Sequence, residues 1–200
     1  MCGIIARVGD GDAIRKLVSG LENLEYRGYD SAGVAVQNGS GISVCKRSGQ
    51  VSELKDALVG SVPKGKVGIG HTRWSTHGPP TDENAHPHTS QTDEVAVVHN
   101  GIIENYAELK ATLSEAGHEF TSDTDTEVIP HLFEYYLEDA DEIAEAFRRT
   151  VRDLEGSYAV AALVDGVHAI YAARQGSPLI LGLDDDEYYL ASDVPAFLDH

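Results

Sequence analysis

The opening sequence MCGIIARVG places a cysteine directly behind the initiator methionine. Removal of Met1 would leave Cys2 with a thiol and a free α-amino group on the same residue. Because an α-amine titrates near pH ~8, a useful fraction of it is an unprotonated base at neutral pH. Such an amine can deprotonate the neighbouring thiol, directly or through a water, and later return a proton to a leaving amine. The terminus therefore suggests a nucleophile and its base on one residue.

Segments dense in polar and aromatic residues recur along the chain. They are LEYRGYDSAG (24–33), HTRWSTHG (71–78), NAHPH (84–88), HNGIIEN (99–105) and SDTDTEV (122–128). Together with MCGI and GSPL (176–179), they resemble the glutaminase domain of the glucosamine-6-phosphate synthase family, which is a class II, N-terminal nucleophile glutamine amidotransferase. EYRGYDSAG and HTRWSTHG favour this family over the related amidophosphoribosyltransferases. The resemblance runs from residue 2 to about residue 193.

The resemblance implies a set of catalytic residues. Cys2 would attack the side-chain amide of L-glutamine, release ammonia and form a γ-glutamyl thioester. Asn100 and Gly101 would donate to the oxyanion of the tetrahedral intermediate, although an Asn-Gly pair alone is more typical of a plain turn. Arg27 would support the site, and Gly28 would allow close approach to the terminal amine.

The resemblance also implies substrate-binding residues. Glutamine carries an α-carboxylate and an α-ammonium, and both charges must be paired when they are buried. Arg73 offers a fork for the carboxylate, and Asp125 offers a counter-charge for the ammonium. Without the resemblance, Arg73 would be taken for a surface residue and Asp125 for a helix-start residue. The other substrate-binding residues implied are Trp74, Thr76, His77 and His86.

The nine histidines raise the question of a metal site. His86 and His88 form an H-x-H pair, but no third ligand at a useful spacing accompanies them, so we expect no metal and no cofactor. In the family the NAHPH loop borders the glutaminase pocket. The remaining histidines are interpreted as structural or surface residues: His71, His99, His118, His131, His168 and His200.

The charge is strongly negative, with 15 basic against 33 acidic residues and a formal net charge of −18. Such a field repels nucleic acid phosphates and anionic membrane surfaces, so neither is an expected partner. The acidic residues are scattered, which predicts an acidic surface and favours a halophile's protein. Its melting temperature should rise between low and about molar salt. With no signal peptide and no apolar run of about 18 residues, we expect a cytoplasmic protein.

Periodicity predicts strands at both ends of the chain and helices in the middle. Apolar residues at three- and four-residue steps predict a helix over 14–24. The predicted strands are 3–8, 31–37, 42–47, 67–74, 94–101, 157–164, 167–173, 179–183 and 187–191. The further predicted helices are 105–117, 124–138 and 140–154, with capping pairs Asn105/Glu108 and Thr124/Glu127 opening the first two. Pro130 should kink the second of these or shift its start.

Long apolar strands among helices indicate two central sheets covered by helices. With the resemblance, the fold class is α+β, a four-layer αββα sandwich of the N-terminal nucleophile hydrolase type. We expect one amidotransferase domain over residues 2–200 that is C-terminally incomplete, because the family continues into further strands and a sugar-isomerase module that binds fructose 6-phosphate. That module is the expected partner, and a homodimer is left open.

Two alternatives stay open. The first is another N-terminal nucleophile enzyme acting on a different amide, which comparison of glutamine with asparagine hydrolysis would separate. The second is a regulatory module without catalysis, whose signature would be the loss of nucleophilic residues.

Overall fold

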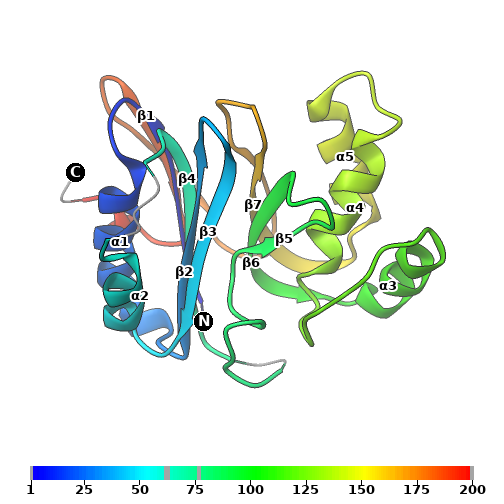
Figure 1. The fold of residues 1–200 in the computed structure, drawn as a ribbon, viewed down its shortest axis with the longest axis horizontal. Helices are drawn as coiled ribbons and strands as arrows, with labels where there is room; N and C mark the ends of the chain where they lie inside the picture. Colours follow the sequence, from blue (N-terminus) through cyan, green and yellow to red (C-terminus); the bar gives the residue numbers. More distant parts are fainter. Residues whose placement is uncertain (1, 61–63, 76–77, 199–200) are drawn as a thin grey trace.

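Two antiparallel sheets face each other in the computed structural model, which describes residues 2–60, 64–75 and 78–198. The helices α1 (Ala13–Asn23) and α2 (Val51–Leu58) cover the outer face of the first sheet. The outer face of the second sheet is covered by α3 (Tyr106–Glu115), α4 (Val128–Leu137) and α5 (Ile143–Asp153) (Figure 1). The predicted four-layer αββα arrangement is confirmed.

The first sheet has six strands and the second has four. In spatial order the first contains β3 (Gly41–Ser48), β2 (Ser31–Asn38), β4 (Val67–Arg73), β1 (Gly3–Gly9), β10 (Glu187–Ala191) and β9 (Ile180–Leu183). The second contains β5 (His88–Thr89), β6 (Val95–Ile103), β7 (Gly156–Val164) and β8 (Tyr171–Gln175). Short 3-10 turns η1 (Glu25–Arg27) and η2 (Val194–Ala196) complete the elements.

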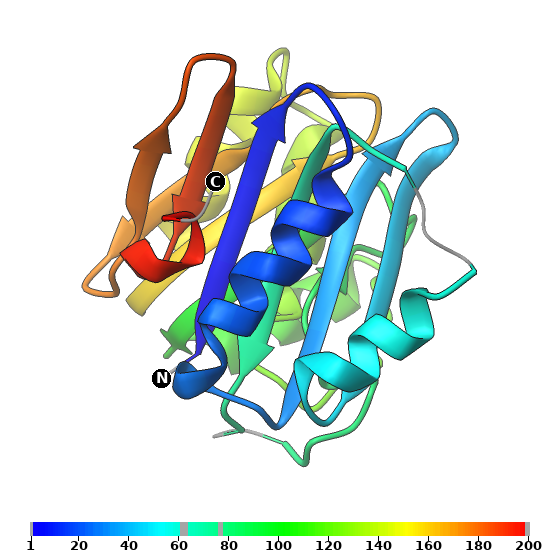
Figure 2. The same ribbon diagram turned by 90° about the vertical axis from the view of Figure 1, so that its left-hand side faces the viewer.

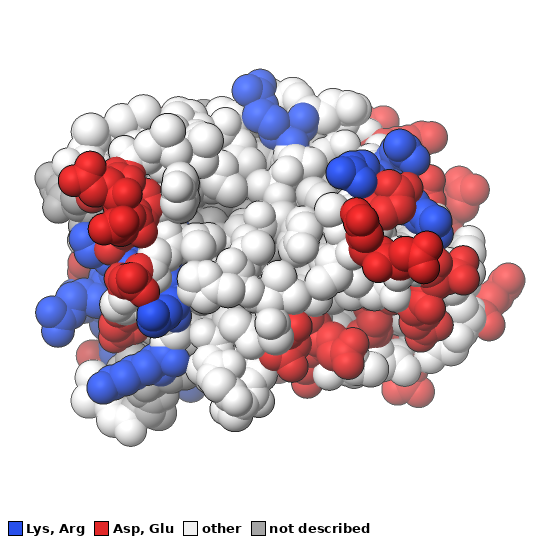
Figure 3. Space-filling model, turned by 90° about the horizontal axis from the view of Figure 1, so that it is seen from above, with Lys and Arg blue, Asp and Glu red and all other residues white. Residues whose placement is uncertain are grey.

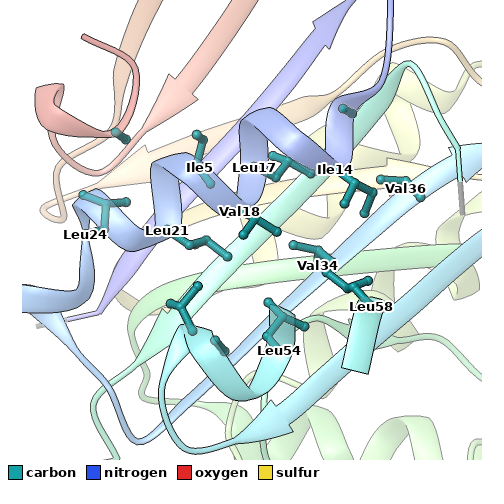
Figure 4. Close-up of a cluster of buried hydrophobic side chains, with 14 of the residues drawn as sticks. Ile5, Ile14, Leu17, Val18, Leu21, Leu24, Val34, Val36, Leu54 and Leu58 are labelled. Atoms are coloured by element: carbon teal, nitrogen blue, oxygen red, sulfur yellow. The ribbon is translucent and has the colours of Figure 1, made fainter. Parts of the chain in front are cut away.

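The alternation of side chains along β1 links three layers. Ile4 faces the second sheet, and Ile5 faces α1, because successive strand residues point to opposite sides. Leu17 and Leu21 lie on the buried stripe of α1, beside the apolar side chains of α2 (Figure 4). Figure 2 shows α1 running over the first sheet with η2 beside it. The strand that follows Cys2 is thus held firmly in the centre of the sheet.

Strand β6 is longer than the sequence indicates. The prediction that it ends at an Asn-Gly turn is wrong, because pairing with β7 continues through Gly101 and Ile102 to Ile103. The physical reason is that β7 supplies a paired backbone along this whole length. Gly101 adopts φ +126° within the strand, a conformation that glycine reaches without strain.

The predicted capping pairs are not confirmed as such. Asn105 precedes α3, but its side chain donates to the Asp153 carbonyl at 2.8 Å and accepts from the Glu155 amide at 3.1 Å. It therefore joins α3 to the start of β7 instead of capping the helix. In the second pair, the side chains of Thr124 and Glu127 also make hydrogen bonds with other residues and not with each other's backbone. The Thr124 hydroxyl pairs with His88, and the Glu127 carboxylate accepts from Thr121.

Pro130 shifts the start of α4 toward the C-terminus, which is one of the two outcomes predicted for it. The helix begins at Val128, so Pro130 stands in its first turn. A backbone N–H at that position has no intrahelical partner, and its absence in proline therefore costs little.

Acidic side chains gather on the two flanks of the face seen in Figure 3, with a few basic side chains among them. The band between the flanks is mostly uncharged, apart from a basic group at its upper edge. This distribution agrees with a broadly acidic surface, and the salt-dependent stability stays a prediction. Among the described residues, no helix has the length and apolar character that a bilayer crossing requires.

Candidate active site

Cys2 lies at the start of the central strand β1. Pairing of Gly3 with Thr72 brings the end of β4 alongside it. The backbone N–H of Trp74 donates to the Cys2 thiol sulfur, with 3.3 Å between N and Sγ. The antiparallel register therefore fixes which segment faces the nucleophile candidate.

Two side chains from distant segments hold the carbonyl oxygen of Cys2. Arg27 Nε and Asn100 Nδ2 each donate to it over 3.0 Å. Arg27 is itself held by Asp193, with 3.0 Å between Nη1 and Oδ2. The Tyr26 hydroxyl donates to the same carboxylate oxygen at 2.5 Å. The backbone of residue 2 is thus held by η1 and by β6 of the second sheet, and Asp193 before η2 holds Arg27 in turn.

Burial raises the pKa of the Cys2 thiol above its ordinary value. The Trp74 amide and the positive charges of Arg73 and Arg27 act in the opposite direction, but they do not outweigh the loss of hydration. A thiol in this environment is protonated at neutral pH. It therefore needs a base before it can act as a nucleophile.

Glycine at position 28 is required by a close approach of two backbones. A Cβ there would lie 2.6 Å from the carbonyl carbon of Arg73 and 2.7 Å from the amide nitrogen of Trp74. Any larger residue would push the 73–74 segment away from its place. Because Trp74 donates to the thiol, this packing also sets the distance between that amide and Cys2.

Arg73 and Asp125 are both buried; Arg73 ends β4 of the first sheet, and Asp125 lies in the segment before α4. The Arg73 guanidinium donates to Ser75 Oγ and to the Pro79 carbonyl, each at 3.3 Å. Burial lowers the pKa of Arg73, against the opposing influence of Cys2, Asp30 and Asp125. Asp125 Oδ2 accepts from the backbone amide of Ile103 at 2.7 Å. A cation that interacts with Cys2 and an anion that interacts with this cation thus come from separate segments of the chain.

The other sequence-predicted residues have mixed positions. Trp74 leaves 44% of its surface exposed and meets Tyr29 edge to face at 5.6 Å. Thr76 and His77 lie outside the described residues. His86 is buried, and its ring stacks at 4.0 Å on that of His71. The structure therefore places His86 against another histidine, with its Nε2 paired to the Thr126 hydroxyl at 3.0 Å.

His71 is the residue that the sequence interpretation missed. Its Nε2 lies 3.0 Å from both Asn100 Oδ1 and the His99 carbonyl oxygen. Both partners are acceptors, so the proton must reside on Nε2. Burial lowers the pKa of His71 to about 3, which keeps the ring neutral. The donated hydrogen bond holds Asn100 Oδ1 and leaves its Nδ2 facing Cys2.

A signal for His71 exists in the sequence. His71 and Arg73 are two residues apart on one strand, so their side chains share a face. Once Arg73 is assigned to the pocket, the same alternation points His71 toward the second sheet. What the alternation does not indicate is the partner across the gap, because Asn100 lies 29 positions away in the chain.

Comparison with known proteins gives consistent matches. A family described as "Glutamine amidotransferase domain" matches residues 71–199. Over 200 residues the chain is 54% identical to the glutamine–fructose-6-phosphate aminotransferase (isomerizing) of Halobacterium salinarum, covering 100% of this chain and 33% of that protein. The protein of the same name from Thermus thermophilus is 52% identical over 199 residues, covering 99% of this chain and 32% of its own length. The chain spans about a third of the length of these curated relatives.

Among solved structures, the glutamine phosphoribosylpyrophosphate amidotransferase from B. subtilis superimposes with a TM-score of 0.84. The two chains are 30% identical, and the match covers 98% of this chain and 43% of the other. This likeness confirms the predicted sandwich type.

Proposed function

The chain belongs to the glutamine amidotransferase domain family, and on that premise we propose that it hydrolyses L-glutamine to glutamate and ammonia. The observation that carries the proposal is the convergence of Arg27, Trp74 and Asn100 on Cys2. These segments are distant in sequence, and together they hold the second residue of the chain in a fixed position. Such a fixed terminus suits a terminal nucleophile better than it suits a structural cysteine.

The nucleophile is Cys2, and the base is its own α-amine after removal of Met1. The raised pKa of the thiol makes such a base necessary. The sulfur bonds to the side-chain amide carbon of glutamine, and the carbon–nitrogen bond breaks as the amine passes the proton to the leaving ammonia. Water then cleaves the γ-glutamyl thioester and restores the thiol. Arg27 and Gly28 keep the terminus in place for both steps.

The oxyanion is held by Asn100 and Gly101. An amide nitrogen carries two N–H groups, so Asn100 Nδ2 can donate to the Cys2 carbonyl and to the oxyanion together. The backbone N–H of Gly101 is the second donor. We assign His71 a positioning role here, since its hydrogen bond to Oδ1 prevents the amide from turning over.

The amino-acid head group is held by Arg73 and Asp125. Arg73 pairs with the α-carboxylate and Asp125 with the α-ammonium, which satisfies both charges once water is excluded. Trp74 shapes the pocket from the segment after β4, and the family resemblance assigns substrate binding to Thr76 and His77 as well. His86 supports the pocket indirectly, because its ring packs against that of His71.

The ammonia acceptor belongs to this proposal as well. The names of the relatives support transfer to fructose 6-phosphate in a sugar-isomerase module, and this chain would be the glutaminase domain over residues 2–200. A cytoplasmic location is part of the same proposal. Hydrolysis of a different amide by the same nucleophile is the competing function, and Arg73 with Asp125 favours an amino acid as the substrate.

The test begins with the terminus. A mass spectrum should show the loss of Met1, and Cys2→Ala should abolish ammonia release from glutamine. The label 6-diazo-5-oxonorleucine should add to Cys2, and Cys45→Ala should be labelled like the unmodified chain. Labelling at Cys45, or equal activity in protein that retains Met1, would refute the mechanism. Asparagine hydrolysis at a rate matching glutamine would instead favour the competing function.

A further inference from the structure

A corner of the second helical layer brings together His118, His131 and Glu134, and we call it the His-His-Glu corner. Helix α3 ends there with Gly117 at φ +101°. The amides of Gly117 and His118 donate back to Ser114 and Leu113, a Schellman ending that fixes where His118 stands. His131 and Glu134 are three residues apart in α4 and therefore share one face of that helix.

Three potential metal-ligand atoms converge in this corner. His118 Nδ1 lies 3.1 Å from His131 Nδ1 and 3.8 Å from Glu134 Oε2. All three ligand atoms lie within 4.8 Å of one another. The side chains of His118 and Glu134 are only 10% and 7% exposed, and His131 is 2% exposed. The polar atoms are thus concentrated in one enclosed place.

We propose that the His-His-Glu corner binds Zn²⁺. Two histidine nitrogens and one carboxylate oxygen are a ligand set that zinc accepts, with a water completing the tetrahedron. Nitrogen ligands at about 2.0–2.1 Å from one tetrahedral ion are about 3.3 Å apart. The observed separation of 3.1 Å between the two nitrogens is close to that value. The carboxylate lies farther out, with 3.8 Å between His118 Nδ1 and Glu134 Oε2, and it must move inward to complete the set.

The surroundings of Glu134 support this ligand role. Its Oε1 accepts from the amide of Thr92 at 3.1 Å and from the Thr92 hydroxyl at 2.5 Å. The carboxylate is therefore oriented with Oε2 toward His118, which is how outer hydrogen bonds aim a metal-binding carboxylate. On the other side, Phe120 stacks on His131 at 4.5 Å between ring centroids.

A path for the ion and a place for the water ligand also exist. A cavity lined by Ser90, Glu119, Glu127 and His131 opens beside the corner. Its acidic side chains attract a cation, as does the overall charge of −18. Bound zinc would tie the end of α3 to α4, the helix that follows the Asp125 segment.

A competing interpretation needs no ion. One imidazole can donate to the other, and a protonated His118 can pair with Glu134. The two interpretations differ in whether Nδ1 of His118 and Nδ1 of His131 carry a proton. The hydrogen bond requires an N–H on one of them, whereas zinc requires a lone pair on both. Addition of metal to the chelator-treated chain therefore separates them.

The experiment uses the full chain after treatment with EDTA and its removal. Calorimetric titration with ZnCl₂ should give one ion per chain. Zinc at about a hundred times its Kd should raise the Tm by roughly 5–10 °C, and MgCl₂ should not, because magnesium prefers oxygen ligands. Substitution with Co²⁺ should produce the visible absorption of a tetrahedral site.

Matched variants locate the ion. His118→Ala and Glu134→Gln should each lose the titration and the Tm rise, with Glu134→Gln keeping an acceptor for Thr92. His168→Ala removes a histidine elsewhere and should bind as the unmodified chain does. Cys2→Ala should also bind normally, which excludes the nucleophilic thiol as the ligand. Absence of zinc binding, or binding that survives in His118→Ala and Glu134→Gln, would overturn the proposal.

Discussion

Two groups of histidines in this molecule occupy different surroundings. The inner histidines, His71, His86, His88 and His99, are all buried, and the rings of His71, His86 and His88 contact one another in series. One nitrogen of each ring has a polar partner: His71 meets Asn100 Oδ1 and the His99 carbonyl oxygen, His86 and His99 share the Thr126 hydroxyl, and His88 meets that of Thr124. The other ring nitrogens of His71, His86 and His99 are buried without a hydrogen-bond partner among the described residues. Burial lowers the pKa of His71 to about 3 and that of His99 to about 4, the latter despite the opposing influence of Asp125. These rings are fixed, neutral donors and acceptors.

The His-His-Glu corner differs because a carboxylate stands beside its rings. Burial alone would raise the pKa of Glu134, but hydrogen bonds from Ser90 and Thr92 and the proximity of His118 hold it below its usual value. An ionised carboxylate next to two imidazoles suits a cation. The neighbours of a histidine, more than its burial, therefore decide whether its ring orients another group or binds a cation.

The strongest test of the orienting role is His71→Ala. Without the Nε2 donor, the Asn100 amide can turn over so that its oxygen, and not its N–H, faces the oxyanion. The oxyanion then loses one of its two hydrogen-bond donors. We expect kcat for glutamine hydrolysis to fall roughly a hundred- to a thousand-fold. The KM should change little, because the oxyanion forms only during reaction. Steady-state kinetics per active site, counted with 6-diazo-5-oxonorleucine, measures both.

The matched variant is His71→Gln, whose amide N–H can reach the place of Nε2. It should recover most of the kcat that His71→Ala loses. Counting active sites removes the contribution of unfolded protein, so a purely structural role would leave kcat per site unchanged. Equal kcat in His71→Ala and the unmodified chain would show that Asn100 is oriented by something else.

Two glycines show that the backbone is packed more tightly near the inner histidines than at the His-His-Glu corner. Gly101 beside the inner histidines and Gly117 at the corner both have positive φ, but their surroundings differ. A Cβ at Gly101 would lie 1.9 Å from the Ser157 carbonyl oxygen, whereas one at Gly117 meets nothing within 4 Å. Gly117→Ala should cost only the strain of the left-handed backbone, roughly 1 kcal/mol.

Gly101→Ala carries the same strain and must also displace the paired strand β7. We expect its free energy of unfolding to fall by about 2 kcal/mol more than that of Gly117→Ala. Urea denaturation of both variants gives this difference. If the two variants are equally stable, the tight pairing of β6 with β7 at Gly101 is not maintained in solution.

The sequence predicts much of the fold because local patterns carry it. The apolar steps of α1 and the apolar runs of β1 and β4 were sufficient to place those elements. The two-residue strand β5 was missed, because so short a segment carries no readable alternation. The early end predicted for β6 shows a different limit, since pairing with β7 overrides the turn preference of Asn-Gly.

The site could not be assembled from local patterns. Arg27 is held by Asp193, which is 166 positions away, and no local pattern relates them. Similarly, His118 and Glu134 come from different elements, so their convergence could not be seen in the sequence. His118 was interpreted as a structural or surface residue, and Glu134 was not singled out. The candidate residues around Cys2 were found because their motifs resemble a family, and their roles stay predictions.

The smallest expected effect is on the pH dependence of stability, and it follows from the lowered pKa of the inner histidines. A buried neutral histidine resists protonation, whereas in the unfolded chain it titrates near pH ~6.5. Below that pH the unfolded state binds more protons, so stability is lost as the pH falls from about 6.5 toward the folded pKa of about 3 for His71. Removing one such ring, in His71→Gln, should lessen the stability lost between pH ~7.5 and ~5.5 by about 1.4 kcal/mol. Gly117→Ala changes no titratable group, so it should lose as much free energy of unfolding between these pH values as the unmodified chain does. The lowered pKa of Glu134 makes stability depend on pH only below about pH 4.5, where the carboxyl of the unfolded chain titrates. Urea denaturation at the two pH values compares the three proteins, and an equal loss in all of them would mean that His71 is not held neutral by the fold.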